Sequence, residues 1–103
     1  MSTVVVRYRP APEHADDNQH LVEDVFAELA RTEPDGLRYA TWRLADGTFV
    51  HIAETGDANP LANSDAFAQF QDGLGERCNN GEGPNPQQAT LVGSYRFLRS
   101  SDT

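Results

Sequence analysis

Residues 37–54 read LRYATWRLADGTFVHIAE, and they predict two β-strands joined by a tight turn. An Asp-Gly pair between β-rich runs is the strongest short-range hairpin signal, because a two-residue type I′ turn needs positive φ at both central positions. If Asp46 and Gly47 form the loop, Ala45 lies opposite Thr48, and the remaining pairs follow by counting outward. This register determines which side chains share a face of the sheet.

Successive side chains of a strand point to opposite faces, so the turn divides the hairpin into two sets. One set is apolar apart from a single histidine, and we expect helices to cover it. In this set Leu44 faces Phe49, Trp42 faces His51, and Ala40 faces Ala53. The opposite face then pairs Tyr39 with Glu54, Thr41 with Ile52, and Arg43 with Val50.

The rest of the chain supplies two more strands and two helices. Residues 3–9 (TVVVRYR) predict a first strand, and residues 89–98 (ATLVGSYRFL) predict the last one. Apolar residues recur at helical spacing over 21–31, and a narrower stripe predicts a second helix over 64–78. The segment 79–88 (NNGEGPNPQQ) has no period and predicts a loop.

The predicted order is therefore βαββαβ, which is that of the ferredoxin-like fold. This α+β fold places two helices on one face of a four-stranded antiparallel sheet. We expect a single ferredoxin-like domain over residues 1–103, with its core over about 3–98 and a frayed C-terminal tail over 99–103.

Composition excludes several classes of partner. The chain has eight arginines, no lysine and sixteen acidic residues, and its net charge of −8 opposes binding to nucleic acid or to anionic membranes. A single cysteine, Cys78, rules out an intrachain disulfide and indicates a reducing compartment. Because the sequence shows neither a signal-peptide pattern nor a membrane-length apolar run, we expect a soluble, cytoplasmic protein.

The face of the sheet away from the helices is expected to be too apolar for a monomer. The apolar side chains assigned to it are Val5, Tyr39, Val50, Ile52, Val92 and Leu98. Monomers rarely leave a contiguous patch of this kind in water. At ~25 cal/mol per Å², burying several hundred Å² offers on the order of 10 kcal/mol before the costs of association. We therefore expect a homodimer formed through the sheet face.

The predicted Trp42–His51 pair suggests a ligand site between sheet and helices. An imidazole with an unperturbed pKa near 6.5 suits proton transfer at neutral pH, so His51 is the candidate catalytic residue. The alternative is a core histidine bonded to a backbone carbonyl. The candidate substrate-binding residues are Trp42, Tyr8, Tyr95, Phe49 and Phe67. Trp42 would stack on an aromatic ligand or, alternatively, simply pack in the core.

No motif predicts a metal or a cofactor. His14 and His20 are six residues apart, which on a helix puts them on opposite sides. We expect both to be solvated, and we expect the protein to bind no metal and to need no cofactor.

The segments GLRYATWRL (36–44), TFVHIAE (48–54) and NPL with AFAQFQ (59–61 and 66–71) carry a resemblance to a known family. The chain resembles the dimeric α+β barrel superfamily, and within it the antibiotic-biosynthesis-monooxygenase-like domains. The resemblance implies a small dimer whose sheets pack together, with a ligand cleft between sheet and helices in each subunit. Some members are cofactor-free oxygenases of phenolic or quinol-like polyketides, some bind haem, some are isomerases, and many have no known activity.

Haem binding is disfavoured within this resemblance. Haem-degrading relatives carry an axial histidine on the second helix and an asparagine on the first strand, and this chain has neither at the matching segments. Two functions remain. The first is a small-molecule-binding protein that acts as a cofactor-independent monooxygenase, or an isomerase, on an aromatic or polyketide-like substrate. The second is a non-catalytic binding or interaction module, because fold does not determine function.

Overall fold

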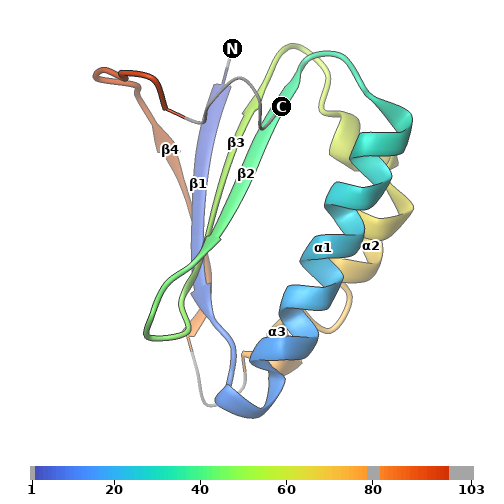
Figure 1. The fold of residues 1–103 in the computed structure, drawn as a ribbon, viewed down its shortest axis with the longest axis vertical. Helices are drawn as coiled ribbons and strands as arrows, with labels where there is room; N and C mark the ends of the chain where they lie inside the picture. Colours follow the sequence, from blue (N-terminus) through green and yellow to red (C-terminus); the bar gives the residue numbers. More distant parts are fainter. Residues whose placement is uncertain (1, 79–81, 98–103) are drawn as a thin grey trace.

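The computed structural model describes residues 2–78 and 82–97 (Figure 1). Its elements, in chain order, are β1 (Ser2–Arg9), the 3₁₀ turn η1 (Pro12–His14), α1 (Ala15–Thr32), β2 (Leu37–Arg43), β3 (Phe49–Thr55), the 3₁₀ turn η2 (Pro60–Asn63), α2 (Asp65–Gln71), α3 (Leu74–Arg77) and β4 (Glu82–Ala89). The four strands form one antiparallel sheet in the order β2-β3-β1-β4. Figure 1 shows α1 and α2 on the same side of this sheet. The predicted ferredoxin-like α+β fold is confirmed.

The core lies between the sheet and the helices. Its buried members are Tyr8, Val22, Val25, Phe49, Leu61, Phe70, Leu74 and Cys78. Helix α1 forms because its apolar side chains recur on one face, which packs on the sheet. Glu28 of α1 joins the two helices, since its carboxylate accepts hydrogen bonds from the Ser64 hydroxyl and the Ala66 backbone N–H at the start of α2. None of the helices described is long and apolar enough to cross a membrane.

The bend between β2 and β3 has three residues rather than the predicted two. Leu44 pairs with Thr48 through a backbone hydrogen bond of 2.7 Å, and the Gly47 N–H donates to the Leu44 carbonyl at 3.0 Å. Gly47 has a φ of 93°, whereas the only described non-glycine residues with positive φ are Glu33 and Arg96. Asp46 therefore cannot satisfy a type I′ turn, and the loop is a type I turn followed by a glycine bulge. The Asp46 carboxylate accepts from the Thr48 N–H at 2.9 Å and stabilises this form.

The extra loop residue shifts the register by one, and the predicted pairing of Trp42 with His51 is wrong. Thr41 lies opposite His51, and Trp42 lies opposite Val50. Because one step of register moves a side chain to the other face, Trp42 and His51 lie on opposite sides of the sheet. The helix-covered face of β2 instead carries Leu37, Tyr39, Thr41 and Arg43. The predicted Tyr39–Glu54 pair is also replaced, since Glu54 lies opposite Arg38.

The last strand is Glu82–Ala89, not the predicted 89–98. It pairs with β1 at the edge of the sheet, with Val6 opposite Pro86 and Arg7 opposite Asn85. An edge strand has a hydrogen-bonded neighbour on one side only, so it can include residues that lack a backbone N–H. Pro84 and Pro86 therefore do not prevent pairing. The segment after Ala89 has no strand structure over 90–97 and leaves its large apolar side chains exposed, while residues 98–103 lie outside the described part.

The predicted second helix is divided in two. Helix α2 ends after Gln71, and Gly73 has a φ of 79° immediately before α3 begins. Glycine adopts this left-handed conformation without the steric cost that a Cβ would add. The break lets Arg77 of α3 turn its guanidinium back toward the end of α2, where it donates to the Phe70 and Asp72 carbonyls.

Replacing Gly47 with alanine is expected to lower the free energy of unfolding by about 1–2 kcal/mol, because alanine is strained at positive φ. Urea unfolding followed by circular dichroism measures this change. Gly56→Ala is the matched control, since Gly56 has open space around its Cβ position and no left-handed φ. Equal effects at both glycines would contradict the bulge.

Candidate functional site

His51 of β3 lies at the centre of a buried polar cluster. Its side chain is 5% exposed, and both ring nitrogens have hydrogen-bond partners. The Tyr8 hydroxyl of β1 lies 2.7 Å from Nε2, and the Tyr39 hydroxyl of β2 lies 2.6 Å from Nδ1. The Thr41 hydroxyl is a further neighbour of Nδ1 at 3.1 Å. The ring is therefore held in one orientation by three hydroxyl groups from the two neighbouring strands.

The cluster continues from Tyr8 into the helices. The Asn18 amide of α1, which is 0% exposed, donates from Nδ2 to the Tyr8 hydroxyl oxygen at 2.9 Å. Arg77 of α3 donates from Nε to Asn18 Oδ1 at 3.0 Å, and its guanidinium lies 5.5 Å from the centre of the Phe70 ring. A continuous chain of hydrogen bonds thus runs from Arg77 through Asn18, Tyr8 and His51 to Tyr39. We call these five residues the hydrogen-bond chain.

Burial shifts the pKa of each titratable ring in this chain toward the neutral form. Desolvation lowers the pKa of His51 from 6.5 to about 4, so its imidazole is neutral at physiological pH. Desolvation also raises the pKa of Tyr39 to about 12, against an opposing effect of the Thr41 hydroxyl. The pKa of Tyr8 is raised further above its ordinary value, again chiefly by burial and against the Asn18 hydrogen bond. The chain therefore holds no charge between Asn18 and Tyr39.

A groove of about 360 Å³ opens beside Tyr39, between the C-terminal half of α1 and the first half of β2. Its lining residues are Phe26, Leu29, Ala30, Glu33, Pro34, Leu37 and Tyr39. The Phe26 ring stacks on the Tyr39 ring with a centroid distance of 4.9 Å. Most of the groove's lining residues are apolar, and Tyr39 and Glu33 are the two that carry a polar side-chain group. We call it the α1–β2 groove.

Glu33 occupies an unusual backbone position in this groove. It ends α1 with a φ of 46° in the left-handed region, where glycine is the favoured residue. A non-glycine residue there costs on the order of 1 kcal/mol or more.

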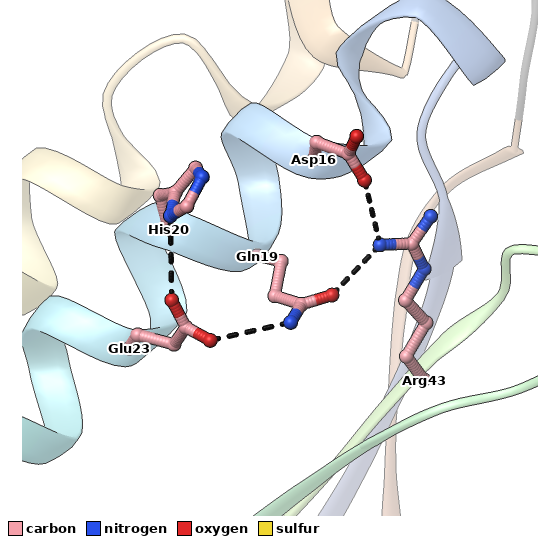
Figure 2. A network of polar contacts seen from close by, with 5 residues as sticks. All are labelled: Asp16, Gln19, His20, Glu23 and Arg43. Carbon is pink, nitrogen blue, oxygen red and sulfur yellow. Dashed lines mark hydrogen bonds and ion pairs between the residues drawn. The ribbon is translucent and has the colours of Figure 1, made fainter.

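The other end of α1 is attached directly to β2. Figure 2 shows Arg43 reaching from β2 to two residues of α1, Asp16 and Gln19, at 3.0 and 2.7 Å. Gln19 in turn donates to Glu23, which also contacts His20 at 3.3 Å. Exposed ion pairs of this kind contribute little stability, about 0–1 kcal/mol each. Their effect is on geometry, because they join helix and strand at the end opposite the α1–β2 groove.

A second hollow of about 200 Å³ lies at the β1–β4 end of the sheet. Its lining is largely polar and consists of Arg7, Tyr8, Thr48, Glu82, Gly83 and Asn85. We place the candidate site at the α1–β2 groove instead, because its lining includes Tyr39, whose hydroxyl is bonded to His51.

The sequence-predicted site residues are only partly together. Tyr8 and His51 are hydrogen-bonded, and Phe49 stacks on Tyr8 with a centroid distance of 5.6 Å in the closed core. Phe67 packs against Phe70 on α2, at a centroid distance of 5.9 Å.

None of the six predicted residues lines the α1–β2 groove, and two of them also lie away from the cluster around His51. Trp42 lies on the opposite face of the sheet, where its ring contacts Phe97 at a centroid distance of 5.6 Å. Tyr95 is 81% exposed and follows β4, so it does not point into the cleft as predicted. The predicted catalytic role of His51 stays a prediction.

Four residues of the cluster were not among the predicted site residues: Tyr39, Thr41, Asn18 and Arg77. Tyr39 and Thr41 were assigned to the wrong face by the one-residue error in the turn. Asn18 did have a signal, because it lies four residues before Val22 and seven before Val25, on the apolar face of α1. A polar residue at a core position of a helix indicates a buried hydrogen-bonding role. Arg77 had no comparable signal.

No protein-family profile matches this chain, and no curated protein matches its sequence. Solved structures do match. A crystal structure of an antibiotic biosynthesis monooxygenase is 21% identical, with a TM-score of 0.65 over 90% of this chain and 100% of the other. SnoaB, a cofactor-independent oxygenase from Streptomyces nogalater solved as a variant, is 17% identical, with a TM-score of 0.62 over 90% of this chain and 94% of that one.

A dimeric ferredoxin-like protein of unknown function from Jannaschia sp. CCS1 is 17% identical, with a TM-score of 0.63 over 87% of this chain and 98% of the other. At these identities the likeness establishes the shared fold alone. The expected resemblance to antibiotic-biosynthesis-monooxygenase-like domains is confirmed at that level.

The pKa of His51 predicts a specific pH dependence of stability. The folded-state value of about 4 lies below the unfolded value of 6.5, so the unfolded chain binds more protons between these pH values. Stability is therefore full above pH 6.5 and falls as the pH drops toward 4. We expect the wild type to lose about 3 kcal/mol more across this window than His51→Gln, which lacks the titrating ring. Urea unfolding at several pH values measures both profiles, and parallel profiles would contradict a neutral buried imidazole.

Proposed function

We propose that the protein binds a small, largely apolar or aromatic molecule in the α1–β2 groove. The observation that carries the proposal is the 2.6 Å contact between the Tyr39 hydroxyl and His51 Nδ1, which joins a residue that lines the groove to a buried neutral imidazole. A volume of about 360 Å³ lies within the range of small-molecule sites. One convergent hydroxyl in an apolar lining suits a planar ring system that carries a single oxygen at one position.

The reaction we propose is cofactor-independent oxygenation of an aromatic, polyketide-like substrate. An activated methylene is converted to a carbonyl by R₂CH₂ + O₂ → R₂C=O + H₂O, which needs an enolate or phenolate form of the substrate and no metal. In this proposal the substrate binds as its enolate or phenolate, with its proton lost to solvent, and Tyr39 donates to the substrate oxygen. The proton taken up when a peroxide forms comes from Tyr39 and is replaced from His51 Nδ1–H. Support comes from this geometry and from the fold shared with SnoaB, described as a cofactor-independent oxygenase.

A non-catalytic binding module is the second candidate, and one observation favours it. Both nitrogens of His51 are hydrogen-bonded, and its pKa of about 4 makes it a weak base at neutral pH. Binding without oxygen consumption would support this second function. We further propose a cytoplasmic location, which the buried free thiol of Cys78 supports.

Binding and oxygen uptake test the first proposal together. Hydroxyanthrones, flavonoids and quinols are to be titrated by calorimetry, and oxygen consumption is to be followed with an electrode. We expect Tyr39→Phe to weaken binding about tenfold through the lost hydrogen bond. His51→Gln should slow turnover about a hundredfold or more.

Tyr95→Phe is the matched control, because it makes the same change at a tyrosine outside the groove. If no compound of the panel binds and none consumes oxygen, the oxygenase proposal fails. If Tyr95→Phe has the effect expected of Tyr39→Phe, the site has been assigned to the wrong face.

We also propose a homodimer formed through the face of the sheet away from the helices. The corrected register puts five apolar side chains at the centre of this face: Val5, Ala40, Trp42, Val50 and Ile52. Phe97 contacts Trp42 on the same side, and the neighbouring Leu91 and Val92 are 68% and 100% exposed. Apolar surface of this kind is unusual on a monomer. The Jannaschia protein with the same fold is described as dimeric.

Ile52→Glu tests the dimer, because it would bury a carboxylate at the centre of the proposed interface. We expect light scattering at micromolar concentration to show the wild type at dimer mass and Ile52→Glu at monomer mass. Ala27→Glu is the control, since it places the same side chain on the exposed side of α1. A wild-type protein at monomer mass would refute the interface.

A further inference from the structure

The hydrogen-bond chain has a direction, and Arg77 sets it. A guanidinium group can only donate hydrogen bonds. Since Arg77 Nε donates to the Asn18 side chain at 3.0 Å, the Asn18 atom that faces it must be the carbonyl oxygen. The amide nitrogen of Asn18 therefore faces Tyr8 and donates to the hydroxyl oxygen at 2.9 Å. This removes the usual ambiguity between the two ends of an asparagine amide.

The direction continues through Tyr8 to His51. The Tyr8 oxygen already accepts from Asn18, and Tyr8 is 2% exposed, so its own hydrogen has to find a partner inside the protein. That partner is His51 Nε2, at 2.7 Å. The opposite assignment would leave a buried hydroxyl hydrogen without an acceptor, which is costly. Nε2 therefore accepts, and the neutral imidazole carries its hydrogen on Nδ1.

The last step of the chain reaches the groove. The Nδ1 hydrogen points to the Tyr39 oxygen at 2.6 Å, with the Thr41 hydroxyl as a second, longer acceptor at 3.1 Å. A Tyr39 oxygen that accepts from His51 turns its own hydrogen away from the imidazole. Tyr39 is one of the lining residues of the α1–β2 groove, so a bound molecule with an acceptor atom would compete with the Thr41 hydroxyl for this hydrogen.

We propose that Arg77 and Asn18 are positioning residues that make Tyr39 a hydrogen-bond donor toward the groove, so that the groove selects planar aromatic ligands with an acceptor oxygen. The ligand class is an aryl ketone, a quinone or an enolate, rather than a molecule that presents an N–H or O–H at this position. The inference rests on the proposed ligand groove, and it specifies which chemistry the groove prefers. Neither positioning residue touches the ligand; both act through His51.

The tautomer of His51 tests the direction without any ligand. Long-range ¹H–¹⁵N correlation spectra distinguish a protonated Nδ1 from a protonated Nε2, and a spectrum of His51→Gln identifies the signals of this residue. We expect the Nδ1–H tautomer in the wild type. An Nε2–H tautomer there would overturn the proposal, whatever the ligand experiments show.

Asn18→Asp is designed to reverse the chain. A carboxylate only accepts, so Asp at position 18 would accept from both Arg77 and the Tyr8 hydroxyl. Tyr8 would then accept from Nε2–H, and Tyr39 would donate to Nδ1 and present its oxygen lone pair to the groove. We expect the Nε2–H tautomer in this variant.

Gln19→Glu is the control for Asn18→Asp, because it makes the same amide-to-carboxylate change one residue along α1, where Gln19 contacts Glu23 and Arg43 instead of the chain. It should leave the Nδ1–H tautomer unchanged. If Asn18→Asp does not fold, Tyr8→Phe provides the second variant. Loss of the hydroxyl that donates to Nε2 should then yield a mixture of tautomers, and an unchanged tautomer would overturn the role of the chain.

Two tricyclic probes of the same shape test the ligand preference. Fluorenone presents only an acceptor oxygen, and carbazole presents only an N–H donor. We expect wild-type protein to bind fluorenone about tenfold more tightly than carbazole, and Asn18→Asp to lose or invert this ratio. If the tautomer is Nδ1–H but the two probes bind equally well, the ligand preference is overturned and the direction of the hydrogen bonds is not. If neither probe binds while the tautomer is as expected, the ligand groove of the proposed function fails and the preference fails with it.

Discussion

The three-residue bend at Ala45–Gly47 controls the chemistry of this protein, because it decides which side of the sheet each hairpin side chain occupies. Gly47 takes the left-handed conformation that a bulge needs, and the Asp46 carboxylate holds the Thr48 N–H in place. With this register, Tyr39 and Thr41 lie on the side of His51, and Trp42 lies on the far side. A two-residue bend would exchange these positions, and the imidazole would then lack both hydroxyl partners at Nδ1.

The cluster around His51 is costly to bury and is therefore fully bonded. Its side chains come from β1, β2, β3, α1 and α3, and every buried side-chain nitrogen or oxygen among the described residues has a hydrogen-bond partner. An unpaired group in such a site costs about 1–3 kcal/mol, so each member depends on its neighbours. The one charged member, Arg77, lies at the end of the chain, where it also bonds the Phe70 and Asp72 carbonyls. The other four residues of the hydrogen-bond chain are thus uncharged, and the positive charge of Arg77 lies at one end.

The two faces of the sheet serve different purposes in our proposals. The helix-covered face holds the core, the hydrogen-bond chain and the α1–β2 groove. The uncovered face is apolar at its centre and suits a second copy of the chain. Because successive residues of a strand alternate between these faces, β2 contributes Leu37 and Tyr39 to the groove and Ala40 and Trp42 to the proposed interface. The exposed polar network at Asp16, Gln19 and Arg43 holds α1 against β2 at one end, while the helix and strand leave a groove at the other.

The sequence by itself determined the order of the elements and the fold class. The β-branched run of β1, the helical stripe of α1 and the Asp-Gly hairpin are local patterns. Local patterns can be recognised without knowing which segments pack together. It also placed His51 beneath the helices. Only the tertiary structure decided the length of the bend, because Asp-Gly is compatible with both two-residue and three-residue loops.

The same holds at the end of the chain and in the site. The edge strand forms over Glu82–Ala89, where β1 offers a free edge, and not over the more β-prone segment that follows. The hydrogen bond from Arg77 to Asn18, which are 59 residues apart in sequence, forms because α3 turns back toward α1. Hydrogen bonds between distant residues leave no periodic pattern in the sequence. The hydrogen-bond chain and its direction could therefore be recognised only from the packed elements.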